Sequence, residues 1–230
     1  MTFVLVPGAG GLAWEWHRLE PELRALGHDV VAIDLPAADD SAGLAEYADA
    51  VVDAIGERTR IVLVAQSFGG FTAPLVCERV DVDMVVMLNA MVPLPGETFG
   101  AWWSNTGQGS AMREYAATLG LTPDDLQDDR IVYYHDLPED LVEAALRLNA
   151  EQSSTPLDQQ WPLARWPDVR TRVLSGRDDR MFPAAFQRRV ARERLGITAD
   201  EIAGGHMVAL ANPKGLAERL DRYAAEVSRG

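Results

Sequence analysis

The stretch from Ile61 to Gly70 constrains the fold of this chain more than any other part of the sequence. Its first four residues are apolar and three of them are β-branched, which is typical of a short buried strand. Ser67 follows, and a glycine pair beginning at Gly69 opens an apolar, helix-compatible segment that runs to Val80. The pattern predicts a strand, a tight turn with Ser67 at its apex and a helix, an arrangement known as a nucleophile elbow. A serine in an ordinary strand-to-helix loop would give the same local sequence. The rest of the chain must therefore show whether Ser67 is a nucleophile or an ordinary loop residue.

Strand and helix patterns alternate on both sides of this stretch. The alternation predicts an α/β fold with a six-stranded, mostly parallel sheet, right-handed crossovers and helices on both faces. Helical spacing is clearest over 44–55, and a first helix with Trp16, Leu19, Leu23 and Leu26 on one face is closed by Gly27. Strands are expected at 2–6, 29–33, 61–64, 85–88, 171–175 and 198–202, and further helices at 71–80, 183–195 and 213–228.

The alternation stops between residues 92 and 166. This part is rich in aromatic residues and helix formers, and helix starts are predicted at 122–125 and 137–140, where proline is followed by acids. We expect residues 1–91 and 167–230 to form the core and residues 92–166 to form a helical cap inserted after the fourth strand. In parallel sheets of this kind, ligands bind beyond the carboxyl ends of the strands, which the cap would cover.

A serine nucleophile needs a histidine as general base. Of the four histidines, His17 and His28 flank the first helix, where surface or capping roles are expected, and His135 is interpreted as a polar cap residue. His206 differs, because it follows two glycines in a loop directly after the last predicted strand. We therefore predict that His206 is the base.

The histidine needs a carboxylate, which should lie between serine and histidine in the chain, after a strand. Asp178 and Asp179 are both candidates, and the spacing from Gly176 favours Asp179. A tetrahedral intermediate also needs N–H donors for its oxyanion, and we expect them to be the backbone groups of Phe68 and Ala9. The loop at residues 7–11 could instead cradle a dinucleotide phosphate, but it has no third glycine at the required place.

Composition excludes other classes of function. The net charge of −14 makes nucleic acid and anionic membrane surfaces poor partners. Cys77 is the only cysteine, so neither a disulfide framework nor a thiolate metal cluster is expected, and no metal site is predicted. The sequence shows no basic-then-apolar leader and no apolar run of about 18 residues. We expect a soluble cytoplasmic protein.

These residues together carry a resemblance to the α/β-hydrolases, and within them to the plant methylesterase and hydroxynitrile lyase group and its bacterial relatives. The resemblance implies a cofactor-free enzyme with a catalytic triad of Ser67, Asp179 and His206 and oxyanion donors on Ala9 and Phe68. It covers both halves of the core, and the cap matches loosely. The matching stretches are residues 3–14, 27–35, 66–70, 179–183 and 204–207.

Three positions depart from the group. Pro7 stands where the group often has a histidine before the oxyanion loop. Met207 replaces the lysine that hydroxynitrile lyases place after the catalytic histidine, and Gln66 replaces the acidic residue before the nucleophile. Because the last two changes remove charges that a lyase would use, they favour ester hydrolysis.

The leading prediction is a serine esterase, a carboxylic ester hydrolase that cleaves a small, largely apolar ester through an acyl-enzyme on Ser67. Trp102, Trp103, Tyr134 and Met207 are the expected substrate contacts. Two alternatives stay open: a lyase or a C–C or lactone hydrolase on the same triad, and a ligand-binding protein on a hydrolase scaffold. The oligomeric state is not fixed by the sequence, and a homodimer is one candidate.

Overall fold

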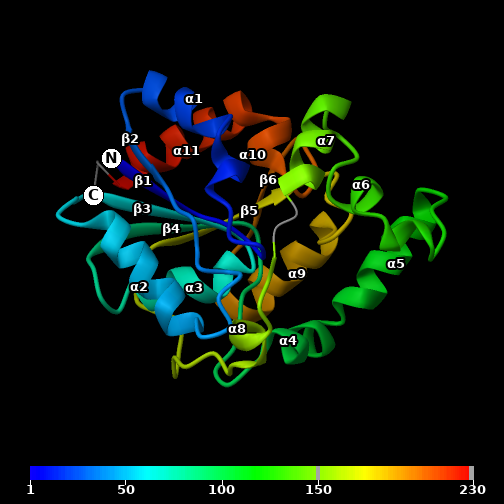
Figure 1. Ribbon diagram of the computed structural model, residues 1–230, viewed down its shortest axis with the longest axis horizontal. Coiled ribbons are helices and arrows are strands. Elements are labelled where there is room, and N and C mark those ends of the chain that lie inside the picture. Colours follow the sequence, from blue (N-terminus) through cyan, green and yellow to red (C-terminus); the bar gives the residue numbers. More distant parts are fainter. Residues whose placement is uncertain (149–150, 228–230) are drawn as a thin grey trace.

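The structure is a computed structural model that describes residues 1–148 and 151–227. These residues contain one sheet of six strands in the order β2-β1-β3-β4-β5-β6 (Figure 1). The predicted α/β architecture is confirmed, and every strand pairing is parallel. The strands are β1 Thr2–Val6, β2 Asp29–Ala32, β3 Ile61–Ser67, β4 Val82–Ala90, β5 Thr171–Gly176 and β6 Asp200–Ile202.

Helices cover both faces of the sheet because successive strand side chains point to opposite sides. In β1, Phe3 and Leu5 belong to one apolar cluster, whereas Val4 and Val6 belong to the other. The first cluster is completed by η1 Ala13–Trp16, α1 Leu19–Ala25, α10 Val208–Ala211 and α11 Pro213–Val227. The second is completed by α2 Leu44–Ile55, α3 Gly69–Val76 and α9 Ala184–Leu195.

The chain between β4 and β5 is helical and irregular, without a strand in its described part. We call residues 92–166 the cap segment. In Figure 1, α5, α6 and α7 lie together on one side of the molecule, beyond the end of the sheet. The helices of the cap segment are α4 Phe99–Thr106, α5 Gln108–Thr118, η2 Asp125–Gln127, α6 Asp129–Val132, α7 Glu139–Leu148 and α8 Thr155–Asp158.

The structure differs from the sequence predictions mainly at element ends. Leu26 was expected on the buried face of the first helix but is 44% exposed, because α1 ends at Ala25 and Gly27 turns the chain away with a φ of +85°. The helix start predicted at 122–125 yields only the short η2 turn. The predicted end of the last helix at Ser228 lies outside the described residues. Within the described part of the chain, we find no helix whose length and apolar character would let it span a membrane.

Candidate active site

Ser67 stands at a sharp turn between β3 and α3. Its φ of +51° lies in the left-handed region, which is costly for a residue with a side chain. Gly69, at the start of α3, is needed because a Cβ there would lie 2.5 Å from the carbonyl oxygen of Pro7. The local sequence therefore forces strand, loop and helix together and holds Ser67 in a strained conformation.

His206 and Asp179 form a buried pair at the ends of neighbouring strands. The His206 Nδ1 lies 2.9 Å from Asp179 Oδ2, and the two residues are 1% and 0% exposed. The other carboxylate oxygen, Oδ1, accepts hydrogen bonds from the backbone N–H groups of Met181 and Phe182 at 2.9 and 2.8 Å. The carboxylate is thus fixed on both sides, and it orients the imidazole. Asp178, the alternative acid, is exposed.

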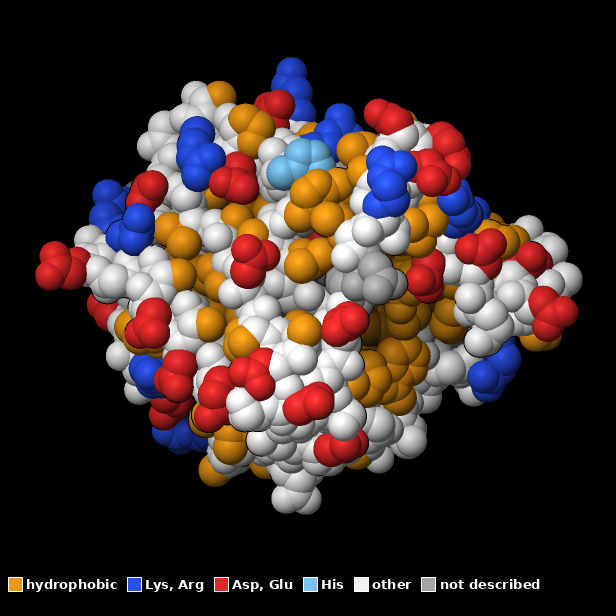
Figure 2. Space-filling view, in the orientation of Figure 1, with side chains coloured by type: hydrophobic (Ala, Val, Ile, Leu, Met, Phe, Trp, Pro, Cys, Tyr) orange, Lys and Arg blue, Asp and Glu red, His pale blue; other side chains and the backbone are white. Residues whose placement is uncertain are grey.

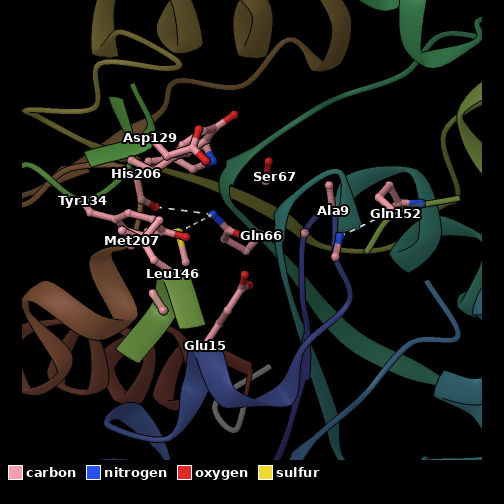
Figure 3. A pocket seen from close by; sticks show the side chains of 14 residues that line it. Ala9, Glu15, Gln66, Ser67, Asp129, Tyr134, Leu146, Gln152, His206 and Met207 are labelled. Carbon is pink, nitrogen blue, oxygen red and sulfur yellow. Dashed lines mark hydrogen bonds between the residues drawn. The ribbon is translucent and has the colours of Figure 1, made fainter. Parts of the chain in front are cut away.

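The second imidazole nitrogen, His206 Nε2, is buried and has no hydrogen-bond partner among the described residues. Aromatic rings flank it, with the Phe182 and Tyr133 ring centroids 5.2 and 5.4 Å from that of His206. His206 and Ser67 line one cavity of about 340 Å³ (Figure 3). The structure therefore brings the predicted serine and histidine to one cavity, and the predicted acid pairs with that histidine.

The loop after β1 passes directly against the serine. A Cβ on Gly8 would lie 2.9 Å from Ser67 Cβ, so only glycine fits this approach. Gly10 N–H donates to Gln152 Oε1 at 3.0 Å, and Gly11 N–H donates to the Gly8 carbonyl at 3.2 Å. The N–H of Ala9 has no acceptor within residues 1–148 and 151–227, and Ala9 lines the cavity. Ala9 thus lies at the cavity, and its role as an oxyanion donor stays a prediction.

Asn89 ties these loops together and was not assigned a role from the sequence. Its φ is +45°, and it is fully buried at the end of β4. Its side-chain amide donates to the carbonyls of Gly205 and His206, both at 3.0 Å, and its oxygen accepts from Gly176 N–H at 2.6 Å. One side chain therefore links the ends of β4 and β5 to the histidine loop. A polar residue at a buried strand end was the signal that could have identified it.

The expected substrate contacts divide into two groups. Tyr134 and Met207 line the cavity, as does Gln66, whose side-chain amide faces the His206 carbonyl at 3.4 Å and the Met207 sulfur at 3.7 Å. Trp102 and Trp103 are not among the described residues that line it. Trp102 is 0% exposed, and its Nε1 donates to the Val92 carbonyl. This side chain of α4 points away from the cavity into an apolar cluster that it shares with Phe182 and Phe186.

The remaining histidines lie outside the cavity lining. His17 is exposed at the end of η1, and the His28 ring nitrogen Nε2 lies 3.0 Å from Asp221 Oδ1. His135 contacts the Asp178 carbonyl through Nε2 at 3.0 Å. His135 thus joins the cap segment to the loop that carries the catalytic-acid candidate Asp179.

Glu15 is a cavity residue that the sequence reasoning missed. It lies in η1 and lines the cavity together with Ser67 and His206. Burial raises the pKa of its carboxyl to about 8, and a hydrogen bond from the Gly8 N–H opposes this rise only in part. The carboxyl is therefore largely protonated at neutral pH. An acid placed between two tryptophans, directly after the glycine-rich loop, was the available signal.

In the part of the chain that the structure describes, no three His, Cys, Asp or Glu side chains gather in a way that could hold a metal ion. Cys77 is unpaired and partly buried, and burial raises the pKa of its thiol to about 12. The thiol is thus protonated at neutral pH and a poor nucleophile.

A model of the alpha/beta hydrolase family matches residues 3–219. The probable esterase PIR7A of Oryza sativa subsp. indica is 29% identical in an alignment of 256 residues, gaps included, that covers 97% of each chain. The alpha-hydroxynitrile lyase of Arabidopsis thaliana is 24% identical over 97% of each chain. The crystal structure of polyneuridine aldehyde esterase superposes with a TM-score of 0.78 at 21% identity, covering 97% of this chain and 98% of that one, which is a likeness of fold.

Proposed function

Because the chain belongs to the alpha/beta hydrolase family, we propose that it is a carboxylic ester hydrolase with Ser67 as its nucleophile. The substrate is a small, largely apolar ester, in keeping with a cavity of about 340 Å³. The observation that carries the proposal is the His206–Asp179 pair: His206 lines the same cavity as the strained Ser67, and its Nε2 has no hydrogen-bond partner among the described residues. Residues 92–166 act as the cap over the core formed by 1–91 and 167–230.

The reaction proceeds in two steps. Ser67 Oγ attacks the acyl carbon while His206 Nε2 takes the hydroxyl proton, and that proton then passes to the leaving alcohol. An acyl-enzyme on Ser67 remains. In the second step His206 takes a proton from water, the hydroxide attacks the acyl carbon, and the proton returns to Ser67 as the acid leaves.

Two sets of groups stabilise the charges that develop. The Asp179 carboxylate accepts from His206 Nδ1 and stabilises the imidazolium in both steps. The backbone N–H groups of Ala9 and Phe68 donate to the oxyanion, and loss of one such donor costs about 3 kcal/mol of transition-state stabilisation.

The lyase alternative lacks support at two positions. Gln66 and Met207 are both uncharged and contact each other, so neither of these two positions supplies the lysine or the acid that a lyase would use. One relative is named a hydroxynitrile lyase, which keeps the alternative worth a direct test. Product analysis over matched esters, lactones and cyanohydrins should give acid and alcohol from the esters as the preferred reaction.

Ser67→Ala tests the proposal. Hydrolysis of p-nitrophenyl acetate should fall at least a thousandfold, since the nucleophile is lost. A fluorophosphonate probe should label the wild type at Ser67 and leave the variant unlabelled. Ser154→Ala, a change at an exposed serine, is the matched control. Wild-type turnover by Ser67→Ala would refute the mechanism, and tight ligand binding without labelling of the wild type would favour the ligand-binding alternative.

A further inference from the structure

One wall of the cavity has the chemistry of an amine-binding subsite, built around the Glu15 carboxyl. Glu15 Oε2 is buried and has no hydrogen-bond partner among the described residues. Figure 3 shows the side chain pointing from η1 toward Gln66 and Ser67. A buried oxygen without a partner is costly, and a ligand that donates a hydrogen bond to it would remove that cost.

A second carboxylate and two aromatic rings lie on the same cavity. Asp129, Tyr133 and Tyr134 all line it, and the centroids of the two tyrosine rings are 6.1 Å apart. Burial raises the pKa of Tyr134 to about 12, and the charges of Glu15 and Asp129 add to this rise. Aromatic faces beside carboxylates are a favourable environment for an organic cation.

No positive side chain balances these acids. Among the described residues that line the cavity there is neither a lysine nor an arginine, and His206 is held by Asp179. The molecule as a whole carries a net charge of −14. An anionic substrate would therefore be repelled, whereas an amine would be attracted both to the molecule and to this wall.

We infer that Glu15 and Asp129, with the rings of Tyr133 and Tyr134, form a subsite for an amine carried by the ester substrate. This inference rests on the proposed ester hydrolysis at Ser67 and narrows its substrate to a small ester that is apolar apart from one amine. The amine donates its N–H to Glu15 Oε2 and packs its alkyl groups on the tyrosine rings. A quaternary ammonium has no N–H and leaves Oε2 without a partner, so a protonated tertiary amine is the better ligand.

The contact between Glu15 and the amine holds one proton between the two groups. At neutral pH both partners arrive protonated, because the pKa of the Glu15 carboxyl is about 8 and a tertiary amine is present as its ammonium ion. Formation of the complex therefore releases one proton to water.

A pair of esters of nearly equal shape tests the inference. 2-(Dimethylamino)ethyl acetate carries a protonated nitrogen where 3-methylbutyl acetate carries a CH group. The measured quantity is the ratio of kcat/KM for the amino ester to kcat/KM for the carbon ester. In Glu15→Gln this ratio should fall about tenfold or more relative to the wild type, as expected for loss of a charge-assisted hydrogen bond. Asp129 is exposed, so Asp129→Asn should lower the ratio only about twofold.

The ratio cancels any general loss of activity that both esters share. Glu57→Gln changes an exposed glutamate that does not line the cavity. It is the matched control and should leave the ratio unchanged. An equal ratio in the wild type and in Glu15→Gln would overturn the inference while leaving ester hydrolysis intact.

A binding measurement separates this inference from the proposed reaction. Calorimetric titration of Ser67→Ala with 2-(dimethylamino)ethyl acetate should give a Kd about tenfold lower than that of the Ser67→Ala/Glu15→Gln double variant. If the wild type hydrolysed neither ester but this Kd difference were present, the subsite would stand and the esterase proposal would fail. Equal Kd values in the two variants would refute the subsite.

Discussion

At the scale of single residues, the site depends on side chains that are strained or buried for a local reason. Ser67 and Asn89 are both non-glycine residues with positive φ, and they stand at the ends of adjacent strands, β3 and β4. Asn89 tolerates this conformation better than most residues, because its short amide side chain is compatible with the left-handed region. Its side-chain hydrogen bonds to Gly176, Gly205 and His206 also stabilise the conformation, since these contacts exist only when the chain turns there.

The raised pKa of Glu15 predicts a pH-dependent stability. The folded-state pKa is about 8 and the ordinary value is 4.5, so the unfolded chain releases the proton first as the pH rises. The contribution of the protonated Glu15 carboxyl to the free energy of unfolding is fully present below pH 4.5 and is lost as the pH rises through about 8. Relative to Glu15→Gln, the wild-type free energy of unfolding should therefore fall by a few kcal/mol over this range, since a tenfold change in a protonation equilibrium is worth about 1.4 kcal/mol.

Urea denaturation of both proteins at pH 5, 7 and 9 measures this difference. Glu57→Gln, with an exposed carboxyl, should track the wild type. If the free energies of unfolding of the wild type and Glu15→Gln differed by the same amount at all three pH values, the Glu15 carboxyl would not have the raised pKa.

At the scale of elements, the segment after α6 clamps the two loops that carry the histidine and its acid. Asp136 Oδ2 accepts from Gly205 N–H at 2.6 Å, next to His206. His135 Nε2 contacts the Asp178 carbonyl at 3.0 Å. Gly205 must be glycine at this contact, because a Cβ there would lie 2.7 Å from His135 Nε2. The cap segment therefore holds in place the two loops that carry His206 and Asp179.

Loss of the Asp136 contact should lower turnover. Asp136→Ala removes the acceptor for Gly205 N–H and frees the histidine loop, so kcat should fall about tenfold, because small misplacements of catalytic groups are costly. Asp136→Asn retains an acceptor oxygen and should keep most of the activity. Steady-state kinetics with p-nitrophenyl acetate would measure both, with the exposed Asp124→Ala as control. Equal kcat values for Asp136→Ala and the wild type would argue against the clamp.

At the scale of the whole molecule, the cap segment and the core are joined by hydrophobic contacts and by a buried ion pair. Figure 2 shows hydrophobic side chains gathered in a hollow on one face, over α9 and beside α4 and α5. Glu97, just before α4, pairs with Arg194 of α9, and the two side chains are only 6% and 7% exposed. Arg194 Nη2 lies 2.9 Å from Glu97 Oε1, and Arg194 also donates to the Val92 carbonyl. The pair fastens the start of the cap segment to the core.

Breaking this pair should destabilise the protein. Arg194→Met leaves the Glu97 carboxylate buried without its partner, and the free energy of unfolding should fall by about 3 kcal/mol or more. Arg192→Met, at an exposed position of the same helix, should cost little. Thermal and urea unfolding of the two variants would measure the difference.

The effect of the pair should disappear in acid. Burial by itself raises the pKa of Glu97, but hydrogen bonds from Arg194, Asn105 and Leu94 outweigh it and hold the pKa below the ordinary 4.5. Stability from the pair is therefore present above pH 4.5 and lost as the pH falls through the lowered pKa. The wild type and Arg194→Met should converge below this range, and a constant difference down to pH 3 would contradict the assignment.

Much of the fold could be predicted from local sequence. Alternating apolar strands and amphipathic helices fix the order of elements, and α2 begins and ends where its helical spacing does, at Leu44 and Ile55. Element ends were less well predicted, as at Leu26, because the last helical residue depends on how the chain leaves the helix. The elbow was predictable because the tight turn after β3 needs small residues at set positions around Ser67.

The sequence by itself determined the sheet, the elbow and the order of serine, acid and histidine, because each depends on residues that are close along the chain or on strand ends that must share one edge. Only the tertiary structure decided which side chains meet in the cavity. It brought Glu15 from η1 to Ser67, turned Asn89 into a link between three loops, and kept Trp102 in the interior. These placements depend on contacts between residues far apart in the chain, and local patterns alone do not fix them.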